Sequence, residues 1–226
     1  MPKGLFIVFE GIDGSGTTTQ CQLLANKIEN LGHPVLKTRE PGGTVLAESI
    51  REILLDPNSK GIADLAELLL YAACRAQHVE EKIRPNLLRG AHVVCDRFTG
   101  STWAYQGFGR GLDLALIAQV TTIAAARCEP DLTIYLRVPQ EQAAGRRAKR
   151  GERPDRMELA GENFQARVAR GYENMAAMDL VKAVTVDGTR HQHQVSEEIW
   201  KILNERWPQF PKVPEATPET TAKGSK

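Results

Sequence analysis

The distribution of apolar residues is the feature of this sequence that most constrains its fold. Five short runs, rich in β-branched and aromatic residues, lie at Leu5–Phe9, Val35–Thr38, His92–Cys95, Leu132–Leu136 and Val184–Val186. Each run is continuous rather than alternating with polar residues, as is typical of strands that are covered on both faces. Helical patterns separate the runs. Alternating strands and helices indicate βαβ units, so we predict a doubly wound α/β fold with a parallel sheet.

Helical periodicity fills the segments between these runs. Apolar residues recur at helical spacing in two of them, at Leu24, Ile28 and Leu31 and at Leu46, Ile50 and Ile53. Gly32 supplies a stop for the first helix. Asp64 and Glu67 resemble a capping box, which predicts that a helix carrying "LLLYAACRAQH" begins there. The longest apolar stretch, from Leu114 to Ala126, predicts a mostly buried helix.

The length and charge of the chain limit the classes of protein to consider. Its 226 residues fit one domain, which we place at residues 1–207, followed by a Pro-, Thr-, Lys- and Glu-rich segment, 208–226, that we expect to be disordered. The 29 basic and 28 acidic residues nearly balance, which argues against nucleic acid or a membrane surface as the main partner. There is no long apolar segment or signal-peptide pattern. With four separated cysteines and no C-x-x-C pair, these features predict a cytoplasmic protein.

The stretch "GIDGSGTTTQ", residues 11–20, follows the first apolar run and resembles a phosphate-binding loop with one residue changed. Gly11, Gly16 and Thr18 fit the pattern G-x-x-x-x-G-K-[ST], but Thr17 stands in place of the lysine. A Gly-rich turn between a strand and a helix N-terminus brings backbone N–H groups together, and the helix dipole favours negative charge. We therefore predict a phosphate site at Gly11, Ile12, Asp13, Gly14, Ser15, Gly16, Thr17 and Thr18, with the Thr18 hydroxyl as a Mg²⁺ ligand. The alternative is a merely flexible turn.

The missing lysine removes a positive charge that would follow the β- and γ-phosphates. A charge-assisted hydrogen bond is worth about 1.5–3 kcal/mol. Thr17 offers a hydroxyl and a backbone N–H but no charge, and Lys27, the next lysine on the helix, lies about 15 Å further along. A replacement charge must therefore come from elsewhere in the chain.

The segment "GRRAKRGERPDR", residues 145–156, is a candidate source of this charge. It carries six basic residues against two acidic ones, and it is interrupted by Gly145, Gly151 and Pro154. Such a composition predicts a mobile lid between two helices, whose arginines swing over a phosphoryl group and which excludes water. The alternative is a solvated charge run that stabilises a helix.

Four further stretches complete a family pattern. They are "TREPGGT" (38–44), "LLLYAACRAQH" (68–78), "DRFTGSTWAYQG" (96–107) and "RPDRME" (153–158). With "FEGIDGSG" (9–16), they resemble the thymidylate kinases in the family's order and spacing over roughly the first 200 residues. The resemblance implies a P-loop nucleoside-monophosphate kinase fold with a five-stranded parallel sheet. It also implies ATP and dTMP as substrates, Mg²⁺ as cofactor, and a homodimer.

The resemblance further implies roles in binding dTMP. Arg39 and Arg97 would bind its phosphate, for which the forked guanidinium is suited. Tyr71 stands where the family usually has a phenylalanine that stacks on thymine, and the alternative is an ordinary core residue. Arg75, four residues later on the same helix face, would bind the carbonyl edge of the base. Three more residues complete the site, with Thr102 at the base edge, Tyr105 against the sugar and Gln106 beside them.

The same resemblance implies the catalytic residues. Asp13 lies where the family places an acid near the acceptor, and Asp96 resembles the acid that organises Mg²⁺, although it could simply cap a strand. The region after Asp187 would be the adenine loop. Some family members carry an arginine in the phosphate loop and others carry arginines in the lid. Because Gly14 occupies the loop position, the chain resembles the second kind, with Arg97 and the lid arginines Arg147, Arg150 and Arg153 as catalytic candidates.

These inferences predict in-line transfer of the γ-phosphoryl group of ATP to dTMP, giving dTDP and ADP. The acceptor phosphate is already ionised near pH 7, so catalysis depends on positioning and charge neutralisation. Three alternatives stay open at this point: another acceptor such as dUMP, a relative that binds dTMP and ATP without efficient turnover, and a structural P-loop protein with no ligand.

Overall fold

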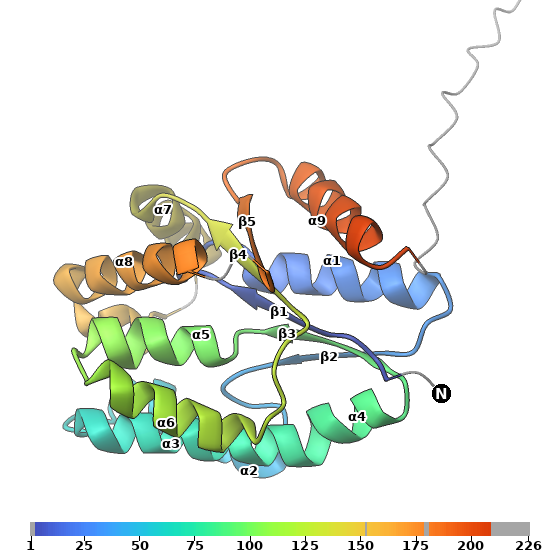
Figure 1. Ribbon diagram of the computed structural model, residues 1–226. Coiled ribbons are helices and arrows are strands. Elements are labelled where there is room, and N and C mark those ends of the chain that lie inside the picture. The colour runs from blue at the N-terminus through green and yellow to red at the C-terminus, as the bar shows by residue number, and fades with distance from the viewer. Residues whose placement is uncertain (1–2, 152, 179–180, 209–226) are drawn as a thin grey trace, which may run out of the picture.

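A single parallel sheet forms the centre of the computed structural model, which describes residues 3–151, 153–178 and 181–208. Its five strands are β1 Phe6–Glu10, β2 Val35–Arg39, β3 His92–Asp96, β4 Leu132–Arg137 and β5 Ala183–Asp187. They lie in the order β2-β3-β1-β4-β5, and every pair is parallel (Figure 1). The predicted doubly wound α/β fold with five strands is confirmed. Residues 209–226 of the predicted tail lie outside the described residues.

Helices cover both faces of the sheet. In chain order they are α1 Thr17–Asn30, α2 Val45–Leu55, α3 Asp64–His78, α4 Arg84–Leu88, α5 Thr99–Thr102, α6 Leu114–Ala125, α7 Gln140–Arg150, α8 Glu162–Met178 and α9 Gln192–Arg206. Two π-helical segments, η1 Val79–Ile83 and η2 Trp103–Gly109, continue α3 and α5, and the 3₁₀ turn η3 Glu158–Ala160 precedes α8. In Figure 1, α1 and α9 lie on one face, and α3, α4 and α6 lie on the other. In the described part of the chain, no helix is both long and apolar enough to span a bilayer.

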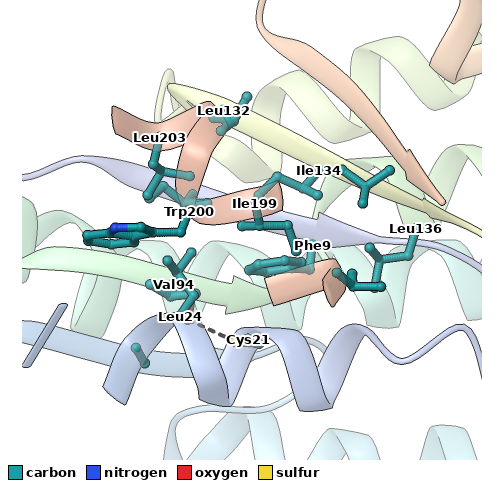
Figure 2. Close-up of a cluster of buried hydrophobic side chains, with 14 of the residues drawn as sticks. Phe9, Cys21, Leu24, Val94, Leu132, Ile134, Leu136, Ile199, Trp200 and Leu203 are labelled. Carbon is teal, nitrogen blue, oxygen red and sulfur yellow. Dashed lines mark hydrogen bonds between the residues drawn. The ribbon is translucent and has the colours of Figure 1, made fainter. Parts of the chain in front are cut away.

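The central strand β1 contributes to the core on both faces of the sheet, which is why its apolar run is continuous. On one side, Ile7 and Phe9 pack with residues of α1 and α9, among them Leu24, Ile199 and Trp200 (Figure 2). On the other side, its alternate residues pack with η1 and α4 in a second cluster, which contains Phe6, Val8, Ile83 and Leu87. Each fully buried large apolar side chain contributes about 1.5–3 kcal/mol. The two clusters therefore hold β1, and the loop that follows it, in a fixed position.

The prediction for the longest apolar stretch is wrong in its burial. A helix forms there, α6, but it buries only Ile117, Thr121, Ala124 and Ala125. Ile123 is 78% exposed, because α6 packs on α3 and η2 with one side only. Leu46 and Ile53 on α2 are likewise exposed. These helices leave apolar side chains on the molecular surface.

The predicted capping box of α3 is also not formed. The helix begins at Asp64 as expected, but Ala63 is its N-cap and makes no side-chain cap bond. Glu67 is fully buried and turns towards Arg110 and Arg156 instead. Hydrogen bonds between charged groups are about twice as strong as neutral ones, so these arginines outcompete a backbone amide for the carboxylate.

Strand register brings the predicted site residues to one edge of the sheet. Phe9 and Arg39 both pair with Asp96, so the carboxyl ends of β1, β2 and β3 lie side by side. In doubly wound sheets, ligands bind outside this edge.

Candidate active site

The phosphate-binding loop joins the end of β1 to the start of α1. Gly14 and Gly16 have φ of 88° and 99°, in the left-handed region that favours glycine. A Cβ atom on Gly14 would lie 2.4 Å from the carbonyl oxygen of Ala143, on α7. The loop can therefore approach α7 closely only because this residue is glycine, and α1 begins directly behind it at Thr17.

Thr18 and Asp96 form a site suited to a hard divalent cation. The Thr18 hydroxyl, in the first turn of α1, donates to Oδ2 of Asp96, the last residue of β3, at 2.5 Å. Asp96 Oδ1 is buried and has no hydrogen-bond partner among the described residues. A buried carboxylate oxygen without a partner is costly unless a ligand completes it. Hydroxyl and carboxylate oxygens are the ligands that Mg²⁺ prefers, directly or through water, so these residues fit the predicted ion.

Arg97 lies at the centre of the site. Its backbone has a φ of 74°, unusual for a residue other than glycine, and its guanidinium donates to Asp13 Oδ1 at 2.6 Å and to the carbonyl oxygen of Gly11 at 2.8 Å. It also donates to the Tyr172 hydroxyl at 2.9 Å, and the Tyr105 hydroxyl donates to Asp13 Oδ2 at 2.7 Å. Burial raises the pKa of both tyrosines, so both hydroxyls stay protonated. Strained backbone of this kind occurs at functional sites when surrounding bonds over-determine it.

Glu10, the last residue of β1, holds the residues around Arg97 in place. It is fully buried and accepts hydrogen bonds from the Phe98 and Ser101 amides, the Ser101 hydroxyl and the Tyr172 hydroxyl. Burial raises the pKa of Glu10, against the effect of these bonds. No role was predicted for Glu10 or Tyr172. An acid at the end of an apolar strand, directly before the loop, is a signal that sequence reasoning could have used for Glu10.

Arg75 organises the part of the cavity formed with Glu40, Tyr71 and Thr102, which we call the base side because the family resemblance predicts that the nucleobase binds there. Its Nε donates to Glu40 at 2.8 Å, one terminal nitrogen to the Thr102 hydroxyl at 3.0 Å and the other to the Phe98 carbonyl at 2.9 Å. Glu40 is also bonded to the buried ring of His78, 3.0 Å away. Neither Glu40 nor His78 was predicted. They fix Arg75 as a rigid donor rather than a mobile surface charge.

A second buried carboxylate, Glu67, joins the base side to Arg156, the last residue of the predicted lid segment. Glu67 accepts from Gln106 at 2.9 Å, from Arg110 Nη2 at 2.9 Å and from Arg156 at 2.6 Å. Arg156 also donates to the Leu54 carbonyl of α2. Burial raises the pKa of Glu67, but the hydrogen bonds from Arg110, Gln106 and Arg156 outweigh it, and its pKa lies below the ordinary value.

The arginine-rich segment is more ordered than predicted at its start. Gly145 does not interrupt the chain, since α7 runs on to Arg150 and ends at Gly151, which has a φ of 68°. Good helix formers surround Gly145, and a glycine inside an exposed helix costs only about 1 kcal/mol. The first half of the predicted lid is therefore helical.

The predicted lid arginines occupy different positions. Arg150 lines the site cavity and pairs with Glu158 at 2.8 Å. Arg147 donates to the Asp13 carbonyl at 2.6 Å but does not line the cavity. Arg153 is exposed and also lies outside the lining formed by the described residues. Among the three, only Arg150 reaches the cavity.

A cavity of about 570 Å³ connects the loop to the base side. Most of the residues predicted for it line it together: Asp13, Gly14, Gly16, Thr17, Thr18, Arg39, Tyr71, Arg75, Asp96, Arg97, Thr102, Tyr105 and Gln106. Gly11, Ile12 and Ser15 are buried in the loop behind it. Arg39 is exposed and pairs with Glu48 at 2.9 Å, and the cavity lining contains two further arginines for which no role was predicted, Arg51 and Arg146.

A smaller cavity of about 300 Å³ adjoins the first on the other side of the loop. It lies between the start of α1 and the segment after β5, and its lining includes Thr19, Gln20, Gly188, Arg190 and Gln192. The phosphate loop therefore separates two cavities.

Comparison with known proteins identifies the group to which this site belongs. A family model described as "Thymidylate kinase" matches residues 9–199. The chain belongs to the thymidylate kinase family. It is 47% identical over 203 residues to the thymidylate kinase of Pelotomaculum thermopropionicum, covering 90% of this chain and 94% of that relative. It is 46% identical to the thymidylate kinase of Nostoc punctiforme, covering 88% and 95%.

A solved thymidylate kinase also shares the fold. The structure from Ehrlichia chaffeensis has a TM-score of 0.74 and 34% identity, covering 89% of this chain and all of that one. Membership of the thymidylate kinase family confirms the predicted resemblance, the nucleoside-monophosphate kinase fold and the enzyme class, a phosphotransferase.

Proposed function

We propose that this site transfers the γ-phosphoryl group of ATP to dTMP, giving dTDP and ADP. The observation that supports it most is that Thr18, Asp96 and Arg97, on the phosphate side, share one cavity with the base-side residues Arg75 and Thr102. A phosphate loop alone would serve any nucleotide enzyme. Its junction with a rigid base-side site favours a nucleoside monophosphate as the acceptor.

The base-side chemistry favours thymine. The Tyr71 ring would stack on the base, since it lines the cavity and packs against the apolar residues Leu54 and Ala47. Burial raises the pKa of its hydroxyl, which therefore stays neutral. Arg75 would donate to a base carbonyl, and Thr102 would meet the N3/O4 edge. Tyr105, held by Asp13, would lie against the sugar and disfavour a ribose 2′-hydroxyl.

The reaction is an in-line displacement. A 5′-phosphate oxygen of dTMP attacks the γ-phosphorus, and the bond to the β–γ bridging oxygen breaks, leaving ADP. Arg97 and Arg39 would hold the acceptor phosphate, and the loop amides with Thr17 and Thr18 would hold the donor. Thr18 and Asp96 would hold Mg²⁺, whose chemistry when bound is to neutralise phosphate charge. Arg150, the predicted lid arginine that reaches the cavity, would leave Glu158 to stabilise the transferring group.

A homodimer is part of this proposal. Exposed apolar side chains lie on three helices that pack on one another, at Val45, Leu46 and Ile53 of α2, Leu65 and Leu69 of α3, and Leu114 and Ile123 of α6. Such a patch marks an interface when it is extensive. We expect sedimentation to give a dimer, Leu69→Glu with Ile123→Glu to give a monomer, and the control Met178→Glu, exposed on α8, to remain dimeric.

We also place the chain in the cytoplasm. Its four cysteines, Cys21, Cys74, Cys95 and Cys128, are buried free thiols, and burial raises the pKa of Cys74 to about 12. Free thiols with so little thiolate character fit a reducing compartment.

A panel of acceptors tests the proposed activity. ADP formation from Mg·ATP should be fastest with dTMP, weaker with dUMP, and near background with the ribonucleotide UMP. Arg75→Lys, which keeps the charge but loses the fork, should reduce the preference for dTMP. Binding of dTMP with no ADP formation under any condition would overturn the proposal in favour of a nucleotide-binding relative.

A further inference from the structure

Arg146 belongs to the predicted lid segment, but the proposed mechanism gives it no role. It lies on α7, half-buried, beside the phosphate loop. Three residues line both cavities, Gly16, Thr19 and Arg146, and Arg146 is the one charged side chain among them. Any ligand that extends from one cavity into the other must pass this guanidinium.

Backbone carbonyl groups hold the Arg146 guanidinium in place. Nη1 lies 3.5 Å from the Gly14 oxygen and 3.3 Å from the Ser15 oxygen, and Nη2 donates to the Gly188 oxygen at 2.8 Å. The guanidinium has five N–H donors, and these three bonds leave donors for a ligand. The charge is thus fixed at the rim of the loop before any ligand binds.

Other cations near the loop have different partners or different proposed roles. Lys27, the lysine of α1, pairs with Glu197 at 2.9 Å and lies over the Trp200 ring. Arg147 donates to the Asp13 carbonyl outside the cavity, whereas Arg97 and Arg150 are assigned above to the acceptor phosphate and the transferring group. In the described part of the chain, every basic residue that lines the larger cavity is an arginine.

We propose that Arg146 supplies, from α7, the positive charge that Thr17 lacks in the loop. The inference rests on the proposed function, because it assumes that a nucleoside triphosphate spans the two cavities with its base in the smaller one. Its β- and γ-phosphates would then lie between the start of α1 and Arg146. A guanidinium can donate to two phosphate oxygens at once, which a lysine ammonium does only as a point charge.

The test is a double-mutant cycle read by ATP binding. Calorimetry with Mg·ATP, without dTMP, would compare the natural chain, Arg146→Gln, Thr17→Lys and the double variant. We expect Arg146→Gln to weaken ATP binding by about 10–100-fold, as loss of a charge-assisted bond does. The gain from Thr17→Lys should be about tenfold larger in the Arg146→Gln background than in the natural chain, because the new lysine restores the missing charge.

Arg147→Gln is the matched control, since Arg147 is the next arginine on α7 and bonds the loop from outside the cavity. Thr17→Lys should give the same gain with Arg147→Gln as in the natural chain. Arg146→Lys, which keeps the charge, should retain most of the ATP affinity, and thermal unfolding without nucleotide checks that each variant is folded.

Equal gains from Thr17→Lys in both the natural and the Arg146→Gln chains would overturn the inference. So would an equal loss of affinity in folded Arg146→Gln and Arg146→Lys, since geometry rather than charge would then matter. A natural chain that binds ATP through Arg146 yet forms no ADP with dTMP would leave this inference standing and overturn the proposed function. A natural chain that binds no ATP would overturn both.

Discussion

The base side of the larger cavity and its lid side are built in opposite ways. On the base side, Arg75 is 2% exposed and spends its three nitrogens on Glu40, Thr102 and a backbone carbonyl. On the lid side, the Arg150 side chain is 46% exposed and pairs with Glu158 at 2.8 Å. Fixed donors recognise a ligand without rearranging, whereas an exposed arginine can be recruited when the ligand arrives.

This difference indicates that the two sides have different roles in binding and catalysis. Preorganised charges cost no reorganisation when the substrate binds, so the base side should set affinity for dTMP. Charges that move into place only with both substrates bound should act on the transition state. Substitutions on the two sides should therefore change different kinetic constants.

The largest effect should come from the lid. Arg150→Gln should lower kcat for dTDP formation by about 10³-fold or more, as expected for an arginine that stabilises a transferring phosphoryl group. The Kd for dTMP, measured by calorimetry, should stay within about twofold. Lys149→Gln, an exposed neighbour on α7, is the control and should leave kcat unchanged. Weaker dTMP binding by Arg150→Gln would show that the lid side also contributes to dTMP affinity, contrary to this assignment of roles.

Arg97→Gln should change both constants. Because Arg97 connects Asp13, Gly11 and Tyr172, we expect kcat/KM for dTMP to fall by about 10²–10³-fold with weaker dTMP binding. Arg84→Gln on α4, whose arginine pairs with Glu80 on the surface, serves as the control. Loss of kcat with unchanged dTMP affinity would place Arg97 functionally with the lid.

Glu67→Gln should test how firmly the base side is held. Removing the carboxylate leaves Arg110 with Asp64 and Arg156 with the Leu54 carbonyl, but both lose their shortest ion pair. We expect a loss of about 3 kcal/mol in the free energy of unfolding, since both arginines keep some solvent contact. The pKa of Glu67 is lowered below its ordinary 4.5, so its stabilisation is present above pH 4.5 and is lost as pH falls through the folded value. Urea unfolding of both proteins should show the difference shrinking below pH 4.5, and a difference that grew there would contradict this assignment.

Asp96→Asn should weaken the binding of Mg²⁺. Loss of an outer-shell carboxylate typically reduces metal affinity by about 10–100-fold. The Mg²⁺ concentration that gives half-maximal rate should rise accordingly, while dTMP affinity stays unchanged. Asp131→Asn, an acid at the opposite end of the sheet that accepts from the Phe6 amide, is the control. An unchanged Mg²⁺ dependence would leave Asp96 as a strand cap only.

Tyr71→Phe should have the smallest effect. The stacking ring is kept, so KM for dTMP should change by less than about threefold, whereas Tyr71→Leu should raise it by about tenfold. A large loss in Tyr71→Phe would mean that the hydroxyl, rather than the ring, contacts the substrate.

The sequence predicted the strands well because each is an apolar run whose two faces are both buried, as in β1. The base-side residues Arg75 and Thr102 could be predicted because they lie in motifs of fixed spacing. Glu67 could not, because its partners Arg110 and Arg156 are distant in the chain, and a local pattern suggested a cap instead. The exposure of Ile123 was missed for a similar reason, since composition does not tell which side of an apolar helix faces a neighbour.

The lid side shows where sequence reasoning reaches its limit. The segment's arginines could be counted, but two adjacent positions on α7 differ: Arg146 lines both cavities, whereas Arg147 donates to a loop carbonyl. Which arginine lines the cavities depends on its angular position around α7 and on the close approach of α7 to Gly14. Both are set by tertiary packing.

The central claim is that the chain is an active kinase despite Thr17. Its most direct test is the rate of dTDP formation from ATP and dTMP, for the natural chain and for Thr17→Lys at matched concentration. We expect turnover at about 1–100 s⁻¹ for the natural chain, ordinary for kinases, and little gain from the substitution. A natural chain that binds dTMP but forms no dTDP, with turnover restored by Thr17→Lys, would contradict it.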